Sequence, residues 1–200
     1  MKALLYKDLW IAKRFSLPML VLAVAICVIP LPFPFDTSAL PLVYGCLLLP
    51  CLFQQEHQEH WYALAAMLPY SSRTLVGSKY FLTGGVILLL GLASFLGPLV
   101  TCPGLSAAER LASTGTLVLS LLMFYTFSLP ALFFLGPGHI GGAYLVGIAG
   151  FGCVGLLSLS FEEAHTFFFG QHFPLVLTLT LLLFLASFLV AVRWYGKRQW

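Results

Sequence analysis

Long apolar runs dominate this chain and constrain its fold more than any other feature. Hydrophobic residues make up 60% of the 200 positions and charged residues only 8%, against about 25% charged in a typical soluble domain. A helix that crosses a bilayer needs about 20 mostly apolar residues. The sequence therefore predicts an all-α, polytopic membrane protein, with one transmembrane domain over residues 1–200 and six transmembrane helices. The predicted spans are residues 16–33, 38–54, 80–100, 111–135, 141–160 and 174–192.

Proline and glycine mark the limits and contacts of these spans. A proline cluster at Pro30, Pro32 and Pro34 ends the first span, because proline removes a backbone donor and restricts the residue before it. Pro41 and Pro50 bracket the second, which predicts a kinked helix. Glycines in the third and fifth spans are expected to let neighbouring helices approach closely. They are Gly84, Gly85, Gly91, Gly97, Gly147, Gly150, Gly152 and Gly155.

Residues 1–15 form a short basic segment ahead of the first span. On a helix of about 100° per residue its basic side chains share one arc with Tyr6 and Trp10, while leucines occupy the other. Such a helix is expected to lie in the headgroup plane of an anionic membrane face before the chain enters the bilayer.

The placement of basic residues predicts the orientation of the chain. With six spans, both termini and the connections 54–79 and 136–140 lie on one side of the membrane. Nine of the ten Lys and Arg residues then fall on that side, and only Arg110 lies opposite. Basic residues concentrate on the cytoplasmic side, so both termini are predicted to be cytoplasmic. Nothing in the charge pattern implies nucleic acid as a partner.

The sequence shows no catalytic apparatus of its own. No phosphate-binding loop of the Gly-x-x-x-x-Gly-Lys-Ser/Thr type is present, so the chain is not expected to hydrolyse ATP. The five cysteines are scattered and lack zinc or redox spacing. Charged residues are also missing from the predicted spans, whereas an ion-coupled carrier would normally need some. Either the chain is a passive or structural membrane protein, or another subunit supplies the energy.

Two clusters of titratable residues carry alternatives that we consider weaker. Glu56, His57, Glu59 and His60 could ligate a metal, but they lack the order of a zinc protease motif, and a solvated cluster is the simpler interpretation. Glu162, Glu163 and His165 invite comparison with intramembrane proteases. No Arg follows that acidic pair, and the predicted position outside the membrane gives exposed carboxylates an ordinary explanation.

The segment between the second and third spans is the most informative. Trp61, Leu64, Ala65 and Leu68 share one face at helical spacing, which predicts an amphipathic helix of about two turns that Pro69 stops. Ser71 or Ser72 can then cap the helix of the third span. An ordinary interfacial loop, with Trp61 and Tyr62 as membrane anchors, is the alternative interpretation.

This segment resembles the permease subunits of type-2 ABC exporters, particularly small members without a fused ATPase. The similarity rests on Glu59 and Trp61, then Leu64, Leu68-Pro69, Ser72-Arg73 and Ser78-Lys79-Tyr80, and on the opening Met-Lys-Ala-Leu-Leu-x-Lys-Asp-Leu. It implies an N-terminal elbow helix, six spans, a cytoplasmic coupling helix, a dimeric permease and, at 161–173, short re-entrant helices. The residues expected to couple to the ATPase are Glu59, Trp61, Leu64, Leu68, Pro69, Arg73 and Lys79.

The function that follows is the permease subunit of an ATP-driven exporter in a bacterial plasma membrane. Its expected partners are a separate ABC ATPase subunit, a second copy or homologous permease, and the lipid bilayer. ATP and Mg are expected on the ATPase subunit, and no cofactor, metal or catalytic residue in this chain. The uncharged spans suit an amphipathic peptide or lipid-like substrate. The alternative is a non-transporting membrane scaffold or assembly factor that docks a soluble partner.

Overall fold

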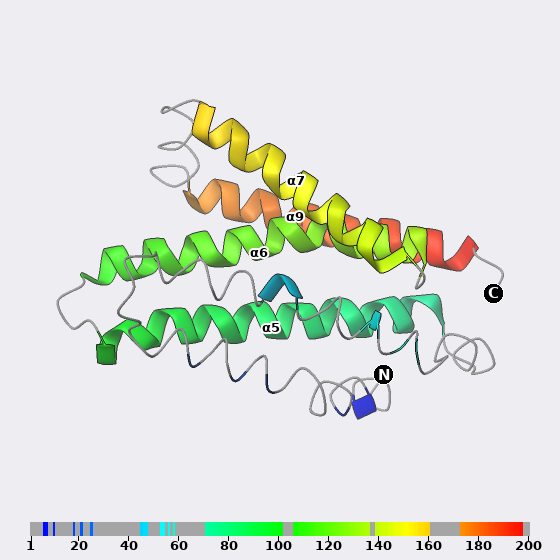
Figure 1. Ribbon diagram of the computed structural model, residues 1–200, viewed down its shortest axis with the longest axis horizontal. Helices are drawn as coiled ribbons and strands as arrows, with labels where there is room; N and C mark the ends of the chain where they lie inside the picture. The colour runs from blue at the N-terminus through cyan, green and yellow to red at the C-terminus, as the bar shows by residue number, and fades with distance from the viewer. Residues whose placement is uncertain are drawn as a thin grey trace. The chain divides into compact units, whose positions relative to one another are not determined.

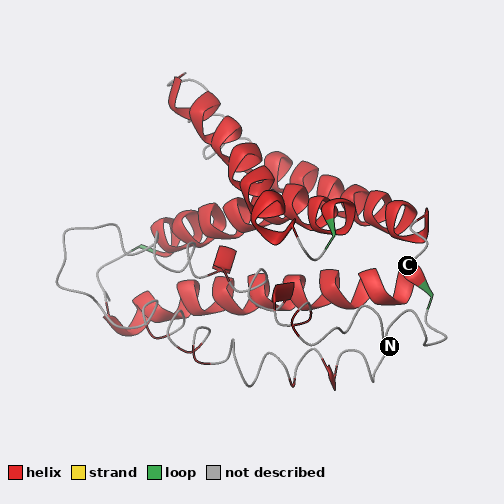
Figure 2. Cartoon of the chain, turned by 45° about the vertical axis from the view of Figure 1, so that its right-hand side comes forward, coloured by secondary structure: helices red, strands yellow, loops and turns green. Residues whose placement is uncertain are grey.

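Four long helices make up most of the described structure, a computed structural model. The described residues are 71–101, 106–136, 139–160 and 173–197, with isolated positions among residues 1–58. The helices are α5 (Ser72–Thr101), α6 (Ala107–Leu135), α7 (Ile140–Ser160) and α9 (Phe173–Lys197) (Figure 1). Among the described residues no strand occurs (Figure 2), so the prediction of an all-α chain is confirmed for this part. The isolated positions are Tyr6, Lys7, Trp10, Pro18, Val21, Ala25, Gly45, Cys46, Leu47, Phe53, Gln54, Glu56 and Gln58.

Three of the helices are long and apolar enough to cross a membrane. These candidate spans are Ser72–Leu96, Thr114–Leu135 and Phe173–Lys197, and α7 contributes a shorter apolar stretch at Ile140–Gly152. α6, α7 and α9 correspond to the predicted fourth, fifth and sixth spans, with ends shifted by a few residues.

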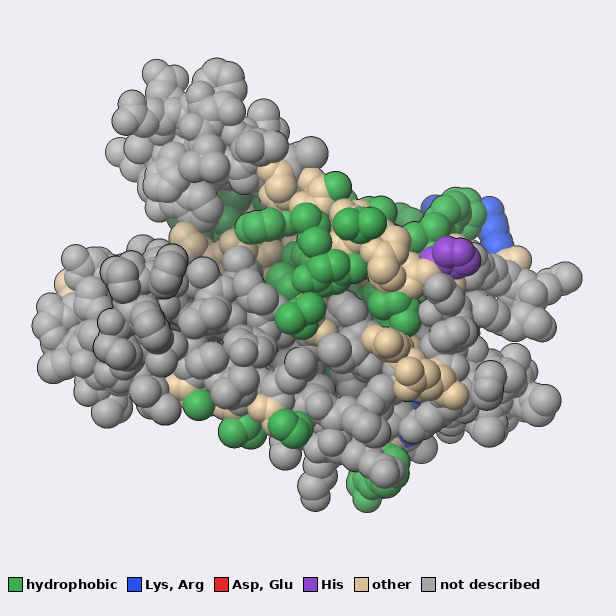
Figure 3. Space-filling model, viewed as in Figure 1, with side chains coloured by type: hydrophobic (Ala, Val, Ile, Leu, Met, Phe, Trp, Pro, Cys, Tyr) green, Lys and Arg blue, Asp and Glu red, His purple; other side chains and the backbone are tan. Residues whose placement is uncertain are grey.

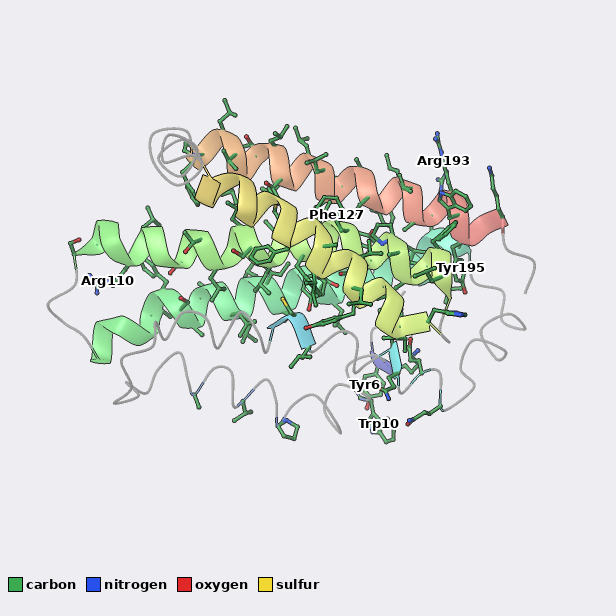
Figure 4. The ribbon with its side chains drawn as sticks, turned by 45° about the horizontal axis from the view of Figure 1, so that its top comes forward. Tyr6, Trp10, Arg110, Phe127, Arg193 and Tyr195 are labelled. Carbon is green, nitrogen blue, oxygen red and sulfur yellow. The ribbon has the colours of Figure 1, made fainter. Side chains whose placement is uncertain are left out.

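Several predicted elements lie mostly or wholly outside the described residues. They include the first two spans, the coupling helix and the re-entrant segment 161–173, of which only Phe173 is described. Of the N-terminal amphipathic segment, Tyr6, Lys7 and Trp10 are helical. The side chains of Tyr6 and Trp10 are exposed (Figure 4).

α5 begins at Ser72, eight residues before the predicted start of the third span at residue 80. Ser71 caps this start, as predicted: the Thr74 backbone N–H lies 3.3 Å from Ser71 Oγ. A Ser cap supplies an acceptor to a first-turn N–H that has no partner inside the helix. The helix therefore takes in the polar stretch that hydropathy assigned to the preceding connection.

The helical residues fall into two units, and α5 and α6 each run through both. The first unit holds residues 1–52 and 81–121, and the second holds residues 53–80 and 122–200. In the first, Gly45 packs so closely that an added Cβ would lie 2.7 Å from the Leu121 side chain and 3.0 Å from that of Leu90. Leu90 and Leu121 are fully buried there.

In the second unit, four helix ends come together. The start of α5 lies against the end of α9, because Ser72 Oγ is 3.6 Å from the position of a Cβ on Gly196. About two turns along α5, Tyr80 contacts Phe184, Ser187 and Phe188 of α9, so the two helices are antiparallel. The end of α6 and the start of α7 join the same end through Leu135 and His139. These are the ends predicted to be cytoplasmic.

The glycines divide into close contacts and open positions. A Cβ on Gly147 would lie 2.8 Å from both Phe124 and Ser128 of α6, and one on Gly150 would lie 2.5 Å from Phe127. In the first unit, a Cβ on Gly91 would lie 2.9 Å from the Val118 side chain. The predicted close packing is confirmed at these three glycines. At Gly84, Gly85 and Gly152 an added Cβ would meet nothing within 4 Å, so these glycines make no close contact with the described helices.

Candidate coupling site at the start of α5

A buried ion pair joins the residues just before and just after the segment 57–78, which includes most of the residues predicted to couple to an ATPase. Lys79 Nζ donates to Glu56 Oε1 at 2.5 Å. The Glu56 residue is 1% exposed and Lys79 is 8% exposed. Both residues belong to the second unit, and residues 57–78 lie between them in the sequence.

Helical spacing places both charges on inward-facing positions. Phe53 and Glu56 are one turn apart and both buried, whereas Gln54 and Gln58, also one turn apart, are exposed. This is the pattern expected when side chains three or four residues apart share a helix face. On α5, Val76, Lys79 and Thr83 form the corresponding buried row. Glu56 and Lys79 therefore both lie on the buried faces of their helical segments.

Aromatic rings surround the pair and connect it to α6 and α9. Lys79 Nζ lies 5.4 Å from the centroid of the Phe53 ring, within the range of a cation–π contact. Phe53 meets Phe133 of α6 edge to face at 5.8 Å, and Phe133 meets Tyr195 of α9 in the same way at 5.8 Å. Figure 4 shows Tyr195 on the inner side of α9, while Arg193 points outward. The ion pair is therefore part of a continuous packed cluster.

The residue after Lys79 holds α5 to α9. The Tyr80 hydroxyl lies 3.0 Å from Ser187 Oγ, and Ser187 Oγ in turn donates to the Phe184 carbonyl at 2.8 Å. A serine hydroxyl carries a single hydrogen, so Tyr80 must be the donor. The Tyr80 ring also packs on Phe184 and Phe188, with centroids 5.1 and 5.3 Å away. The hydroxyl and ring contacts of Tyr80 therefore hold the first part of α5 against the middle of α9.

The residues predicted to contact an ATPase are only partly described. Glu59, Trp61, Leu64, Leu68 and Pro69 lie outside the described residues. Arg73 is exposed in the first turn of α5, where a surface contact is open to it. Lys79 is buried against Glu56, so its observed contact is within the chain.

Two expectations from the sequence are wrong at this site. Glu56 was assigned to a solvated cluster but is buried, because Lys79 and Phe53 cover it. Lys79 was placed in the polar connection before the third span, but it lies inside the candidate span Ser72–Leu96. Pairing explains both differences, since a buried charge is tolerated when an opposite charge and hydrogen bonds accompany it. The partner of Glu56 could not be read from one sequence, because it lies 23 residues away.

The metal alternative concerns residues that the structure mostly leaves out. His57, Glu59 and His60 lie outside the described part, where Glu56 alone of the four is placed. Within the described residues, no group of three or more His, Cys, Asp or Glu side chains could hold a metal ion. Glu56 has Lys79 as its partner, which a bound metal would have to displace.

The buried ion pair contributes to the packing of α5 against residues 53–56. Removing one partner of a buried ion pair typically costs about 3–5 kcal/mol, because the remaining charge is left uncompensated. The Glu56–Lys79 pair is thus a stiff closure at the base of segment 57–78.

Helical spans of this kind define a multi-pass membrane protein, and comparison with known families identifies its class. A family model described as "ABC-2 family transporter protein" matches residues 3–196. The chain therefore belongs to the ABC-2 family of transporters, whose members are generally transmembrane permease subunits that work with an ATPase subunit. No curated protein and no solved structure gives a match.

Proposed function

We propose that this protein is the permease subunit of an ATP-driven exporter whose ATPase is a separate polypeptide. Membership of the ABC-2 family over nearly the whole chain supports this proposal. The observation in the structure that carries it is the Glu56–Lys79 pair, which closes the base of the proposed coupling segment. A loop that only anchored the chain to lipid would have no need of a stiff link to three helices.

The ATPase contact is formed by residues 59–73 in this proposal. Trp61, Leu64 and Leu68 insert into a groove on the ATPase, with Glu59 and Arg73 making charged contacts around them. Buried aromatic and aliphatic anchors ringed by polar contacts usually carry most of the energy of an interface. The exposed position of Arg73 at the start of α5 is consistent with that role.

Transport follows from movement of this segment. When two ATPase subunits close on ATP, they displace the coupling helices of two permease copies. The Glu56–Lys79 pair and the Tyr80–Ser187 hydrogen bond carry the displacement into α5 and α9. The spans then rock between inward-open and outward-open states, each favoured by different contacts. ATP and Mg stay on the partner subunit throughout.

The proposed substrate is amphipathic, either a peptide or a lipid-like molecule, moved out of the cell. Large apolar side chains are exposed along the described helices. Lys79, inside a candidate span, forms its ion pair with Glu56 of the same chain. Both features suit an amphipathic substrate better than a small ion.

Reconstitution in proteoliposomes tests this function. The permease is combined with each stand-alone ABC ATPase of its host, and ATP-dependent movement of fluorescent peptides and short-chain fluorescent lipids is followed. We expect one ATPase to support movement, and a variant of that ATPase lacking its catalytic glutamate to abolish it. A partner that binds without any ATP-dependent movement of these probes would favour the scaffold alternative.

A further inference from the structure

A basic, aromatic pocket lies at the end of the second unit where α6 and α9 stop. It has a volume of about 420 Å³ and is lined by Phe134, Leu135, His139, Trp194 and Lys197. Figure 3 shows the histidine (purple) beside basic (blue) and hydrophobic (green) side chains on the face in view. The role proposed above for the start of α5 makes no use of this pocket.

Local structure explains how His139 reaches the pocket. α6 ends at Leu135, and Gly136 follows with a φ of 87°, a conformation that glycine adopts without strain. The Gly136 N–H donates to the Leu132 carbonyl, a common helix-ending bond. The His139 N–H then donates to the Gly136 carbonyl at 3.1 Å, closing a tight turn that leads into α7. The turn holds His139 beside Phe134 and Leu135.

The rings of the pocket are fixed against each other. Phe134 and Trp194 meet at right angles with centroids 4.8 Å apart. Each is about half exposed, at 49% and 48%. A Trp at the end of a span favours the headgroup level, because its ring is apolar while its N–H can donate a hydrogen bond.

The net charge of the pocket favours an anion. The C-terminal ends of α6 and α9 each carry roughly half a negative charge, and the start of α7 carries roughly half a positive one. The full positive charge of Lys197 in the last turn of α9 outweighs this balance. No acid occurs in the first turn of α7, so nothing there competes for its N–H groups.

One apolar stripe, among the many exposed apolar side chains of α9, leads away from the pocket. Leu183, Val190 and Trp194 are exposed and spaced seven and four residues apart, so they lie on one helix face. α9 is a candidate membrane span along its whole length, Phe173–Lys197. A ligand that combines an anionic head with a long acyl chain matches both the basic pocket and the stripe.

We propose that this pocket binds the headgroup of an anionic phospholipid. The phosphate lies between Lys197 and His139 and accepts a hydrogen bond from the Trp194 indole, while an acyl chain lies along Leu183 and Val190. Basic pockets between spans on the cytoplasmic side are typical sites for anionic headgroups. The proposal goes beyond the transport function and does not require an ATPase.

Fluorescence quenching by brominated lipids tests the site directly. The parent protein has Trp10, Trp61 and Trp200 replaced by phenylalanine, so that Trp194 is the single tryptophan. It is reconstituted in bilayers with either brominated phosphatidylglycerol or brominated phosphatidylcholine as the quencher. We expect phosphatidylglycerol to occupy the site about fivefold more strongly, the usual effect of one basic residue near an anionic headgroup.

Two variants and a matched control separate the pocket from general attraction to a basic surface. Lys197→Gln should bring the lipid preference close to one, and His139→Gln should lower it. Arg193→Gln removes a charge one turn earlier on α9, outside the pocket lining, and should retain the preference. Helix content and the gel-filtration profile are checked for every variant. If one of the two pocket variants is misfolded, the other is used for the test.

Three results would overturn the proposal. The first is equal quenching of the parent by both lipids. The second is a loss of preference in Arg193→Gln as large as that in Lys197→Gln. The third is a lipid preference unchanged in both pocket variants. If the same substitutions in the wild-type chain then lower copurification of an ATPase, the pocket is a protein contact.

Discussion

Lys79 Nζ of α5 contacts Glu56 Oε1 at 2.5 Å, and both side chains are almost completely buried. The two residues bracket the segment proposed to receive the force of ATP binding. Phe53 lies under the Lys79 ammonium group and meets Phe133, which in turn meets Tyr195. One polar contact thus connects the proposed coupling segment to three helices.

The first prediction separates the stability of the Glu56–Lys79 pair from its role in transmission. Lys79→Met alone should destabilise the protein by about 3–5 kcal/mol, because Glu56 is left unpaired. The double variant Glu56→Gln/Lys79→Met should recover most of that loss, since no buried charge remains. Detergent unfolding followed by tryptophan fluorescence measures both.

Transport gives the second half of that test. We expect the double variant, although stable, to show weakened coupling between ATP hydrolysis and substrate movement in proteoliposomes. A double variant with normal stability and a normal ratio of substrate moved to ATP hydrolysed would show that the pair is structural only.

The second prediction concerns the hydrogen bond between α5 and α9. Tyr80→Phe keeps the ring contacts with Phe184 and Phe188 but removes the donor to Ser187. Interhelical hydrogen bonds in membranes contribute about 0.6 kcal/mol on average, so we expect a small loss of stability. Tyr80→Ala also removes a buried ring and should cost several times more. Equal unfolding midpoints for the two variants would contradict the observed packing.

The third prediction tests the close contact of α6 and α7. Gly147→Ala would place a methyl group 2.8 Å from Ser128 Cβ, an atom that cannot move without its backbone. Overpacking of this kind typically costs about 1–3 kcal/mol. Gly152→Ala is the matched control on the same helix, because nothing lies within 4 Å of the added group. We expect Gly147→Ala to lower the unfolding midpoint and Gly152→Ala to leave it unchanged.

The fourth prediction is the orientation in the membrane. In a background with all five cysteines replaced, Ser72→Cys should react with an impermeant maleimide only after the cells are opened. Ala107→Cys, at the start of α6, should react from outside. Arg110 follows in the first turn of α6 (Figure 4), where the predicted orientation places it outside. Labelling of position 72 in intact cells would reverse the proposed topology.

The sequence predicted the helical class and the positions of the later spans well, because long apolar runs in lipid leave the backbone few alternatives. It also predicted the Ser71 cap, which is a local signal. It began the third span at residue 80, because Lys79 looked like a membrane boundary, whereas the candidate span begins at Ser72. The charge is accommodated inside the helix by Glu56, a partner that no local pattern reveals.

The close helix contacts could be predicted only in part, because the residues that meet lie far apart in the sequence. A glycine in a span indicates that close approach is possible, and Gly147 and Gly150 use it while Gly152 does not. Which face of α7 meets α6 depends on the three-dimensional arrangement. The aromatic contacts of Phe133 with Phe53 and Tyr195 likewise join residues far apart in the chain.

Residues 59–73 are proposed to couple this permease to a separate ATPase, and affinity purification from native membranes tests that contact. Tagged wild-type protein and the variant Leu64→Asp are purified side by side, after equal membrane insertion has been verified. We expect an ABC ATPase with Mg-dependent ATP hydrolysis to copurify with the wild type. We also expect Leu64→Asp to lose that ATPase, because a carboxylate would be buried without a partner in an apolar contact. Recovery of the same amount of ATPase with unchanged hydrolysis by both proteins would contradict the account.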